Sequence, residues 1–151
     1  GSVDAVLERL MKEQDFWPSA QHLDDHSDAD ALGGPIADMV VNQSRLLRDN
    51  AVLREIRSWE LVDRNDLTAK LAEEREGASM EFLKRNDINA GDERVPLVAL
   101  MLAGVLYLGL RSNTADSFMG ISLKSAEGWD QIEAKVAEIL SDAFNTDSDG
   151  T

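Results

Sequence analysis

The sequence contains no cysteine among its 151 residues. This absence excludes disulfide bonds, thiolate metal ligands and a cysteine nucleophile. Proline occurs three times, and no segment shows the sustained alternation of apolar and polar residues that is typical of a half-buried strand. The chain therefore lacks the sequence signals of a β-protein and of a fold held together by disulfides.

Basic residues are also few, 15 against 29 acidic ones, which gives a formal net charge of −14. A chain this acidic is repelled by phosphate backbones and by anionic membranes, so we expect these residues to bind neither duplex DNA nor a membrane. The sequence has no G-x-S-x-G or H-E-x-x-H motif and no glycine-rich phosphate loop. We therefore expect neither an enzyme nor a bound cofactor.

Helical periodicity is what the sequence does contain, and it predicts an all-α fold. Apolar residues recur at spacings of three and four in most segments. Pro35 suits the first turn of a helix, Asp49 or Asn50 suits the cap of the next one, and Ser125 suits the cap of the last. Together the patterns predict about six helices, at residues 3–11, from Pro35, at 51–57, from about Ser58 to Arg85, at 95–110 and at 125–144.

We interpret residues 3–144 as one domain. A hydrophobic content of 43% is typical of a globular chain. We expect Gly1 and Ser2 to be a cloning scar. The polar stretch 145–151 is expected to be a disordered tail.

Two of the expected helices have unusual apolar patterns. The segment "VPLVALMLAGVLYLGL", residues 95–110, carries no charge. It is shorter than the roughly 20 residues that span a bilayer, so we predict a helix that is buried on all sides. The last helix has an apolar seam at alternating spacings of three and four, the pattern by which helices pack side by side, formed by Trp129, Ile132, Val136 and Ile139.

Two polar clusters each have two interpretations. His22 and His26 lie at i and i+4 in "HLDDHSD", which suits a metal site with a carboxylate as third ligand, but the segment equally suits an acidic surface loop. We favour the loop and predict no metal. The arginines 45, 48, 54 and 57 form the one basic concentration. One interpretation is that they bind an anion or an acidic surface. The other, which we favour, is that they pair with the nearby acidic residues.

The order of segments resembles the ligand-binding and dimerisation domain of TetR-family transcriptional regulators. "VDAVLERLMKEQ" is similar to the helix that follows their helix-turn-helix, and "NAVLREIRSWELVDRNDLTAKLAEEREGASMEFL" is similar to their short helix and long helix. The closing pair of helices in that domain is matched by the segment "ERVPLVALMLAGVLYLGLRSNTADSFMGISLKSAEGWDQIEAKVAEILSDAF" of this chain. The likeness covers most of residues 3–144, and the phrase from Phe118 to Trp129 carries much of it.

This resemblance implies a homodimer in which the apolar helix and the last helix of each subunit form a four-helix bundle. Small residues such as Ala99, Ala103 and Gly104 would let these helices approach closely. Uncovered, the last helix's seam would in any case be an association site. We expect the dimer interface to contain Val98, Leu102, Val105, Trp129, Ile132, Val136 and Ile139.

The resemblance also implies an effector pocket among the helix from Pro35, the short helix, the long helix and the apolar helix. Methionine and aromatic side chains adapt well to small ligands, although each of them is also an ordinary core residue. Gln43 lies on the face of Ile36, Val40 and Leu47, so it points inward and orients a ligand or meets a backbone group. We expect the pocket to be lined by Met39, Gln43, Trp59, Met80, Leu83 and Met101.

The function that the resemblance implies is that of the effector-binding domain of a cytoplasmic transcriptional repressor. Its effector would be small and mostly apolar or aromatic. An anionic effector is disfavoured unless Arg45, Arg48 or Arg64 turns inward. DNA would be bound only by a helix-turn-helix that precedes Val3 in the parent protein. The alternative is a helical protein–protein interaction module without a small-molecule ligand.

Overall fold

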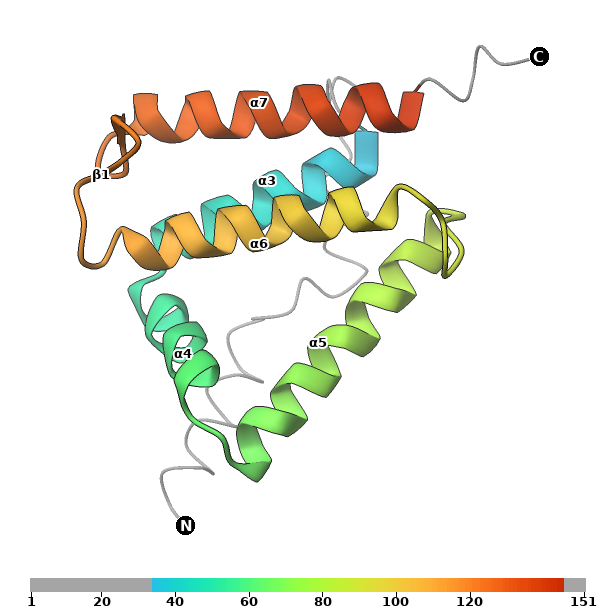
Figure 1. Cartoon of the computed structure of the whole chain (residues 1–151), viewed down its shortest axis with the longest axis horizontal. Coiled ribbons are helices and arrows are strands. Elements are labelled where there is room, and N and C mark those ends of the chain that lie inside the picture. The colour runs from blue at the N-terminus through green and yellow to red at the C-terminus, as the bar shows by residue number, and fades with distance from the viewer. Residues whose placement is uncertain (1–33, 146–151) are drawn as a thin grey trace.

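The computed structural model describes residues 34–145 of the chain. Figure 1 shows this part as a set of helices with one very short hairpin. The predicted helix at 3–11, the segment of His22 and His26 and the tail beyond Asn145 lie outside the described residues. The all-α fold class is confirmed for the described part, whose helices are α3 (Gly34–Asp49), α4 (Ala51–Val62), α5 (Asp66–Arg85), α6 (Val95–Arg111) and α7 (Ala126–Asn145).

Helix α3 occupies the centre of the arrangement. It packs against α6 on one side and against α7 on another, and these three helices lie side by side in Figure 1. Helix α4 contacts both α3 and α6, whereas α5 leads away from the end of α4 and returns to the start of α6 through residues 86–94. Helices α4 and α5 therefore form a V beside the layer of α3 and α6.

The predicted long helix from Ser58 to Arg85 is wrong, because the chain breaks at residues 63–65. Asn65 and Thr68 form a capping box, in which each side chain accepts a 3.0 Å hydrogen bond from the backbone N–H of the other residue. This reciprocal pair satisfies two amides that a helix start leaves without partners. Helix α4 begins as expected, since Asn50 Oδ1 accepts from Leu53 N at 3.0 Å.

Helix α6 is apolar all round, but the described chain buries only one side of it. Val98, Val105 and Gly109 are buried, and a Cβ atom on Gly109 would lie 3.0 Å from Leu47 Cβ of α3. Leu100 is 68% exposed, so burial on all sides does not hold within residues 34–145. No helix in this described range is long and apolar enough to cross a membrane.

A hairpin precedes α7, although no strand was expected from the sequence. Strands β1 (Ser117–Phe118) and β2 (Ile121–Ser122) pair antiparallel, and the two residues between them have positive φ, 51° at Met119 and 80° at Gly120. Such a pair is the signature of a tight type I′ turn. Two residues per strand are too few to produce a visible alternation in the sequence.

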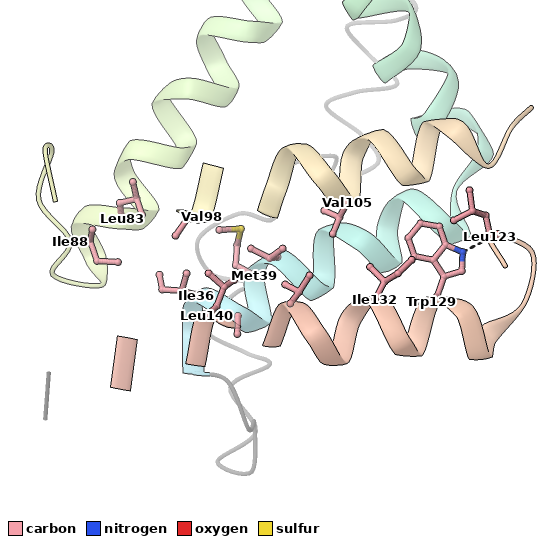
Figure 2. Close-up of a cluster of buried hydrophobic side chains, with 13 residues drawn as sticks. Ile36, Met39, Leu83, Ile88, Val98, Val105, Leu123, Trp129, Ile132 and Leu140 are labelled. Atoms are coloured by element: carbon pink, nitrogen blue, oxygen red, sulfur yellow. Dashed lines mark hydrogen bonds between the residues drawn. The ribbon is translucent and has the colours of Figure 1, made fainter. Parts of the chain in front are cut away.

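The hairpin holds the start of α7. As expected, Ser125 caps this helix, with its Oγ accepting from Gly128 N at 3.2 Å. Gly128 lies so close to the hairpin that a Cβ atom there would clash with the carbonyl oxygen of Ser122. The buried Trp129 donates from Nε1 to the carbonyl oxygen of Leu123 at 3.0 Å, as Figure 2 shows.

The core has two parts. The larger lies among α3, α6 and α7 (Figure 2) and includes the fully buried Val40 and Leu140. The smaller joins α3, α4 and α5 through Leu47, Leu53, Ile56, Leu67 and Leu71. The apolar stripe of α3 therefore contributes to both parts and links them.

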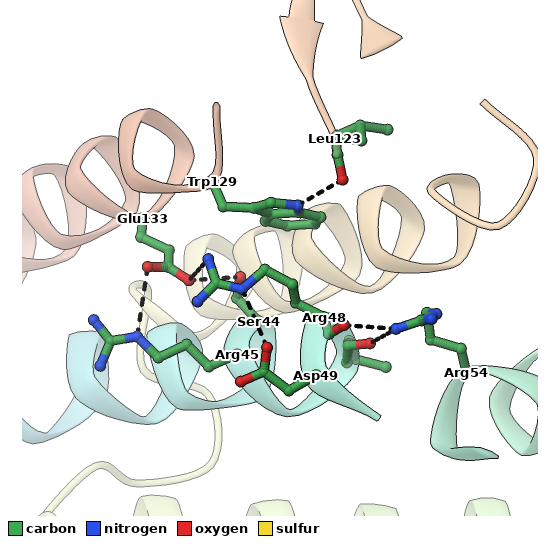
Figure 3. Close-up of polar contacts among 9 residues, drawn as sticks. Ser44, Arg45, Arg48, Asp49, Arg54, Leu123, Trp129 and Glu133 are labelled. Atoms are coloured by element: carbon green, nitrogen blue, oxygen red, sulfur yellow. Dashed lines mark hydrogen bonds and ion pairs between the residues drawn. The ribbon is translucent and has the colours of Figure 1, made fainter. Parts of the chain in front are cut away.

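A buried carboxylate connects α3 to α7, as Figure 3 shows. Glu133 of α7 accepts a 3.2 Å hydrogen bond from Ser44 Oγ, and its oxygens lie 3.5 Å from Arg45 Nε and 3.7 Å from Arg48 Nη1. Both Ser44 and Glu133 are buried. Two of the basic residues thus pair with an acid far along the chain, in addition to the 3.6 Å contact of Arg48 with its neighbour Asp49.

We predict that Glu133→Gln destabilises the protein by about 1–3 kcal/mol, because the buried Nη1 of Arg48 loses its counter-charge. Chemical denaturation measures this change. Glu138→Gln is the matched control on the same helix, since Glu138 is exposed and pairs with the exposed Lys135. This control should leave the denaturation midpoint unchanged, because exposed pairs contribute little. Equal effects of the two substitutions would contradict a connecting role for Glu133.

Candidate ligand cavity

A cavity of about 240 Å³ lies among α3, α4, α5 and α6. Its volume is far above the roughly 10–15 Å³ that one water needs, and it approaches the lower end of the range for small-molecule sites. Most of its wall is apolar, and it is lined by Met39, Gln43, Leu47, Arg57, Arg75, Ala78, Ser79, Phe82, Leu83, Val98, Leu102, Ala103, Val105 and Leu106. Because Ala78, Ser79 and Ala103 are exposed as well as lining it, the cavity opens to solvent between α5 and α6.

Met39, Gln43 and Leu83 were expected to line a pocket, and the structure places them on this wall. They come from α3 and α5, where their apolar stripes face inward. Gln43 is half-buried, so its amide is available at the wall without being sealed in the core.

The other three expected lining residues lie elsewhere. Trp59 packs against the smaller core, Met101 packs against the larger core, and Met80 is 40% exposed. Their neighbours Ser79 and Leu102 line the cavity instead. One residue turns a helix by about 100°, so a register error of one position moves a side chain off the wall.

The residues expected at a dimer interface are mostly inside the single chain. Val98, Leu102 and Val105 line the cavity, and Trp129, Ile132 and Val136 are buried in the larger core, which leaves only Ile139 of the seam half-buried. The physical reason is α3, which packs against both α6 and α7 and covers their apolar faces. The large apolar side chains that α6 leaves exposed are Leu100 and Tyr107.

The sequence did not predict a charged cluster on the wall of the cavity. Arg57 of α4 and Arg75 of α5 both stand on the wall. Glu60 lies behind them, with Oε1 2.6 Å from Arg75 Nη2 and Oε2 3.9 Å from Arg57 Nε. The pairing of Arg57 with Glu60 was expected, but Arg75 sits in the charged run "AEEREG" and carries no local sign of facing inward.

Burial shifts the pKa of all three groups in this cluster. It lowers the pKa of Arg75 to about 10, helped by repulsion from Arg57 and opposed by Glu60. It also lowers the pKa of Arg57, and it raises the pKa of Glu60 despite the attraction of both arginines. Both guanidinium groups still carry their charge at neutral pH, so the ionised cluster has one net positive charge.

His22 and His26 of the candidate metal segment lie outside the described residues. Within residues 34–145 no group of three acidic or histidine side chains is placed to hold a metal ion. Comparison with known proteins finds no family model, no curated protein and no solved structure that matches the chain.

We predict that, as the pH rises, the stability of the Glu60→Gln variant increases relative to that of the native protein. The raised pKa means that folded Glu60 binds its proton more tightly than the unfolded chain does. Its stabilising contribution is therefore complete below the unfolded pKa, near 4.5, and is lost as the pH rises through the folded value. Denaturation of both proteins at a series of pH values from 4.5 upward measures the difference. If the native protein instead becomes more stable relative to the variant as the pH rises, the attraction between Glu60 and Arg75 outweighs the effect of burial.

Proposed function

We propose that this chain is the effector-binding and dimerisation domain of a transcriptional repressor of the TetR type. The observation that carries the proposal is the cavity itself. It lies among four helices, α3 to α6, which correspond to the segments in which the resemblance puts an effector pocket. A mostly apolar wall with a few polar groups is the usual construction of a small-molecule site.

A second copy of the chain is the proposed partner, and the exposed face of α6 supports it. Leu100 and Tyr107 lie two turns apart and are 68% and 51% exposed. Ala103 and Gly104 lie between them and are also exposed, and a Cβ atom on Gly104 would meet nothing within 4 Å. This face is apolar and uncharged, and its central side chains are small, so a second α6 has room to approach closely.

Helix α3 supplies a physical link between effector and partner. One side of it lines the cavity through Met39, Gln43 and Leu47, and another holds α7 through Ser44 and Glu133. An effector that moves α3 would therefore move α7. In the intact regulator this movement would change the spacing of two DNA-binding heads, whose half-sites lie about 34–36 Å apart.

The alternative is a helical protein–protein interaction module with no small-molecule effector. The same exposed α6 face favours it, together with Met119 of the hairpin, which is 87% exposed. In that case the cavity would be a packing defect, and filling it would change no binding.

We predict that the neutral amphiphile octanamide raises the unfolding temperature of the protein by binding in the cavity. A ligand at 100 times its Kd adds about 2.7 kcal/mol of stability. Ala78→Phe should abolish the shift because Ala78 lines the cavity. Ala72→Phe is the matched control, since Ala72 is exposed on the same helix and outside the lining. Identical shifts for both variants would place octanamide elsewhere and favour the interaction module.

We predict that the chain is a dimer at micromolar concentration and that Leu100→Glu makes it monomeric without unfolding it. A charge on the apolar α6 face would be buried and unpaired at an interface, but it stays in water in a single chain. Light scattering should give twice the mass of one chain for the native protein. Leu61→Glu is the control, because Leu61 on α4 is equally exposed, at 67%, and should leave the dimer intact. A native protein with the mass of one chain would refute the proposed dimer.

A further inference from the structure

The cavity wall has a charge opposite to that of the chain. The protein carries a net charge of −14, yet among residues 34–145 the charged side chains that line the cavity are the two guanidinium groups of Arg57 and Arg75. Glu60 neutralises one of them from behind the wall. Among the described residues, the charged part of the wall is therefore cationic, and it lies beside an apolar surface.

Arg57 is the residue whose charge is less well neutralised. Its contact with Glu60, 3.9 Å between Nε and Oε2, is too long for a hydrogen bond, whereas the contact of Arg75 with the same carboxylate is 2.6 Å. Burial is the first cause of the lowered pKa of Arg57. A group whose charged form loses stability through desolvation gains most from a new anionic partner.

The rest of the wall decides what kind of anion fits. Apolar side chains from α3, α5 and α6 make up most of the described lining, among them Met39, Phe82 and Leu102. They would leave the oxygens of a phosphate dianion without donors on most sides. A carboxylate matches the planar fork of a guanidinium, and its alkyl or aryl body matches the apolar wall.

We infer that the effector is a small carboxylic acid bound as its anion. Its carboxylate pairs with Arg57 beside Arg75, and its aliphatic or aromatic body lies against the wall of α3, α5 and α6. This inference rests on the proposed function, since it assigns the effector class of the same cavity. It differs from the expectation that an anion requires Arg45, Arg48 or Arg64, because Arg45 and Arg48 contact Glu133 whereas Arg57 and Arg75 line the cavity.

Three probes of nearly equal shape test the charge preference: octanoate, octanamide and octylammonium, titrated into the full chain by calorimetry at pH 7. Octanoate should bind about 10- to 100-fold more tightly than octanamide, the factor expected of a hydrogen bond to a charged group. Octylammonium should bind more weakly than octanamide. Octanamide that binds as tightly as octanoate would overturn the carboxylate inference and leave the proposed effector site standing.

Variants identify the residue responsible. Arg57→Gln should reduce octanoate affinity to that of octanamide while the affinity for octanamide stays unchanged. Arg64→Gln is the matched control, because Arg64 is exposed and outside the cavity lining, and it should change neither affinity. An equal loss in both variants would show that only the overall charge of the protein matters, and would overturn the inference.

Glu60→Gln provides an independent test should Arg57→Gln not fold. Removing the carboxylate behind the wall takes away a counter-charge of Arg57, so octanoate affinity should rise several-fold and octanamide affinity should not change. A lower octanoate affinity would contradict the inference. If none of the three probes binds to any of these proteins, the carboxylate inference fails, and the effector role of the cavity fails with it.

Discussion

The rest of the described structure depends on the burial of α3 against both α6 and α7. Val40 and Ser44 are fully buried between these helices, and α6 approaches α3 closely enough for Gly109 to meet Leu47. Helix α4 follows α3 after a single residue, so the position of α3 also sets where the V of α4 and α5 begins. A shift of α3 would disturb the core, the cavity wall and the seat of α7 together.

The two buried charge clusters, one around Glu133 and one around Glu60, have different roles in this arrangement. Burying an ion pair costs desolvation that its attraction scarcely repays, so neither cluster is explained by stability alone. Glu133 lies between two helices, where Ser44, Arg45 and Arg48 converge on it and fix how α7 sits on α3. Arg57 and Arg75 instead border an open cavity and share one carboxylate. The first cluster is closed by the protein, whereas the second has room for a further anion.

The sequence predicted those features that neighbouring residues determine, and it failed where distant residues decide. The caps at Asn50 and Ser125 and the apolar stripe of α3 are local and were found. The break before α5 was missed because threonine stands at the third position of the capping box, where glutamate or glutamine is the usual signal. Of the six residues expected at a pocket, Met39, Gln43 and Leu83 line the cavity. An all-apolar helix such as α6 has no polar face to show which side contacts α3. Arg75 reaches Glu60 only because α4 and α5 fold back on each other.

Two adjacent residues of α3 contact the cavity and α7, respectively. A movement of α3 at the cavity would therefore also act on its contact with α7. Gln43 lines the cavity, and Ser44, about 100° further round the helix, donates to Glu133. The contacts of Glu133 with Arg45 and Arg48 are 3.5 and 3.7 Å long, so they depend on charge more than on hydrogen-bond geometry and tolerate small movements. A ligand can shift α3 only by binding one of its positions more tightly than another. In the proposed function, Arg57 and Arg75 on α4 and α5 would hold the anionic end of a ligand while its apolar body contacts Met39 and Leu47 of α3. The affinity for the ligand would then depend on the position of α3.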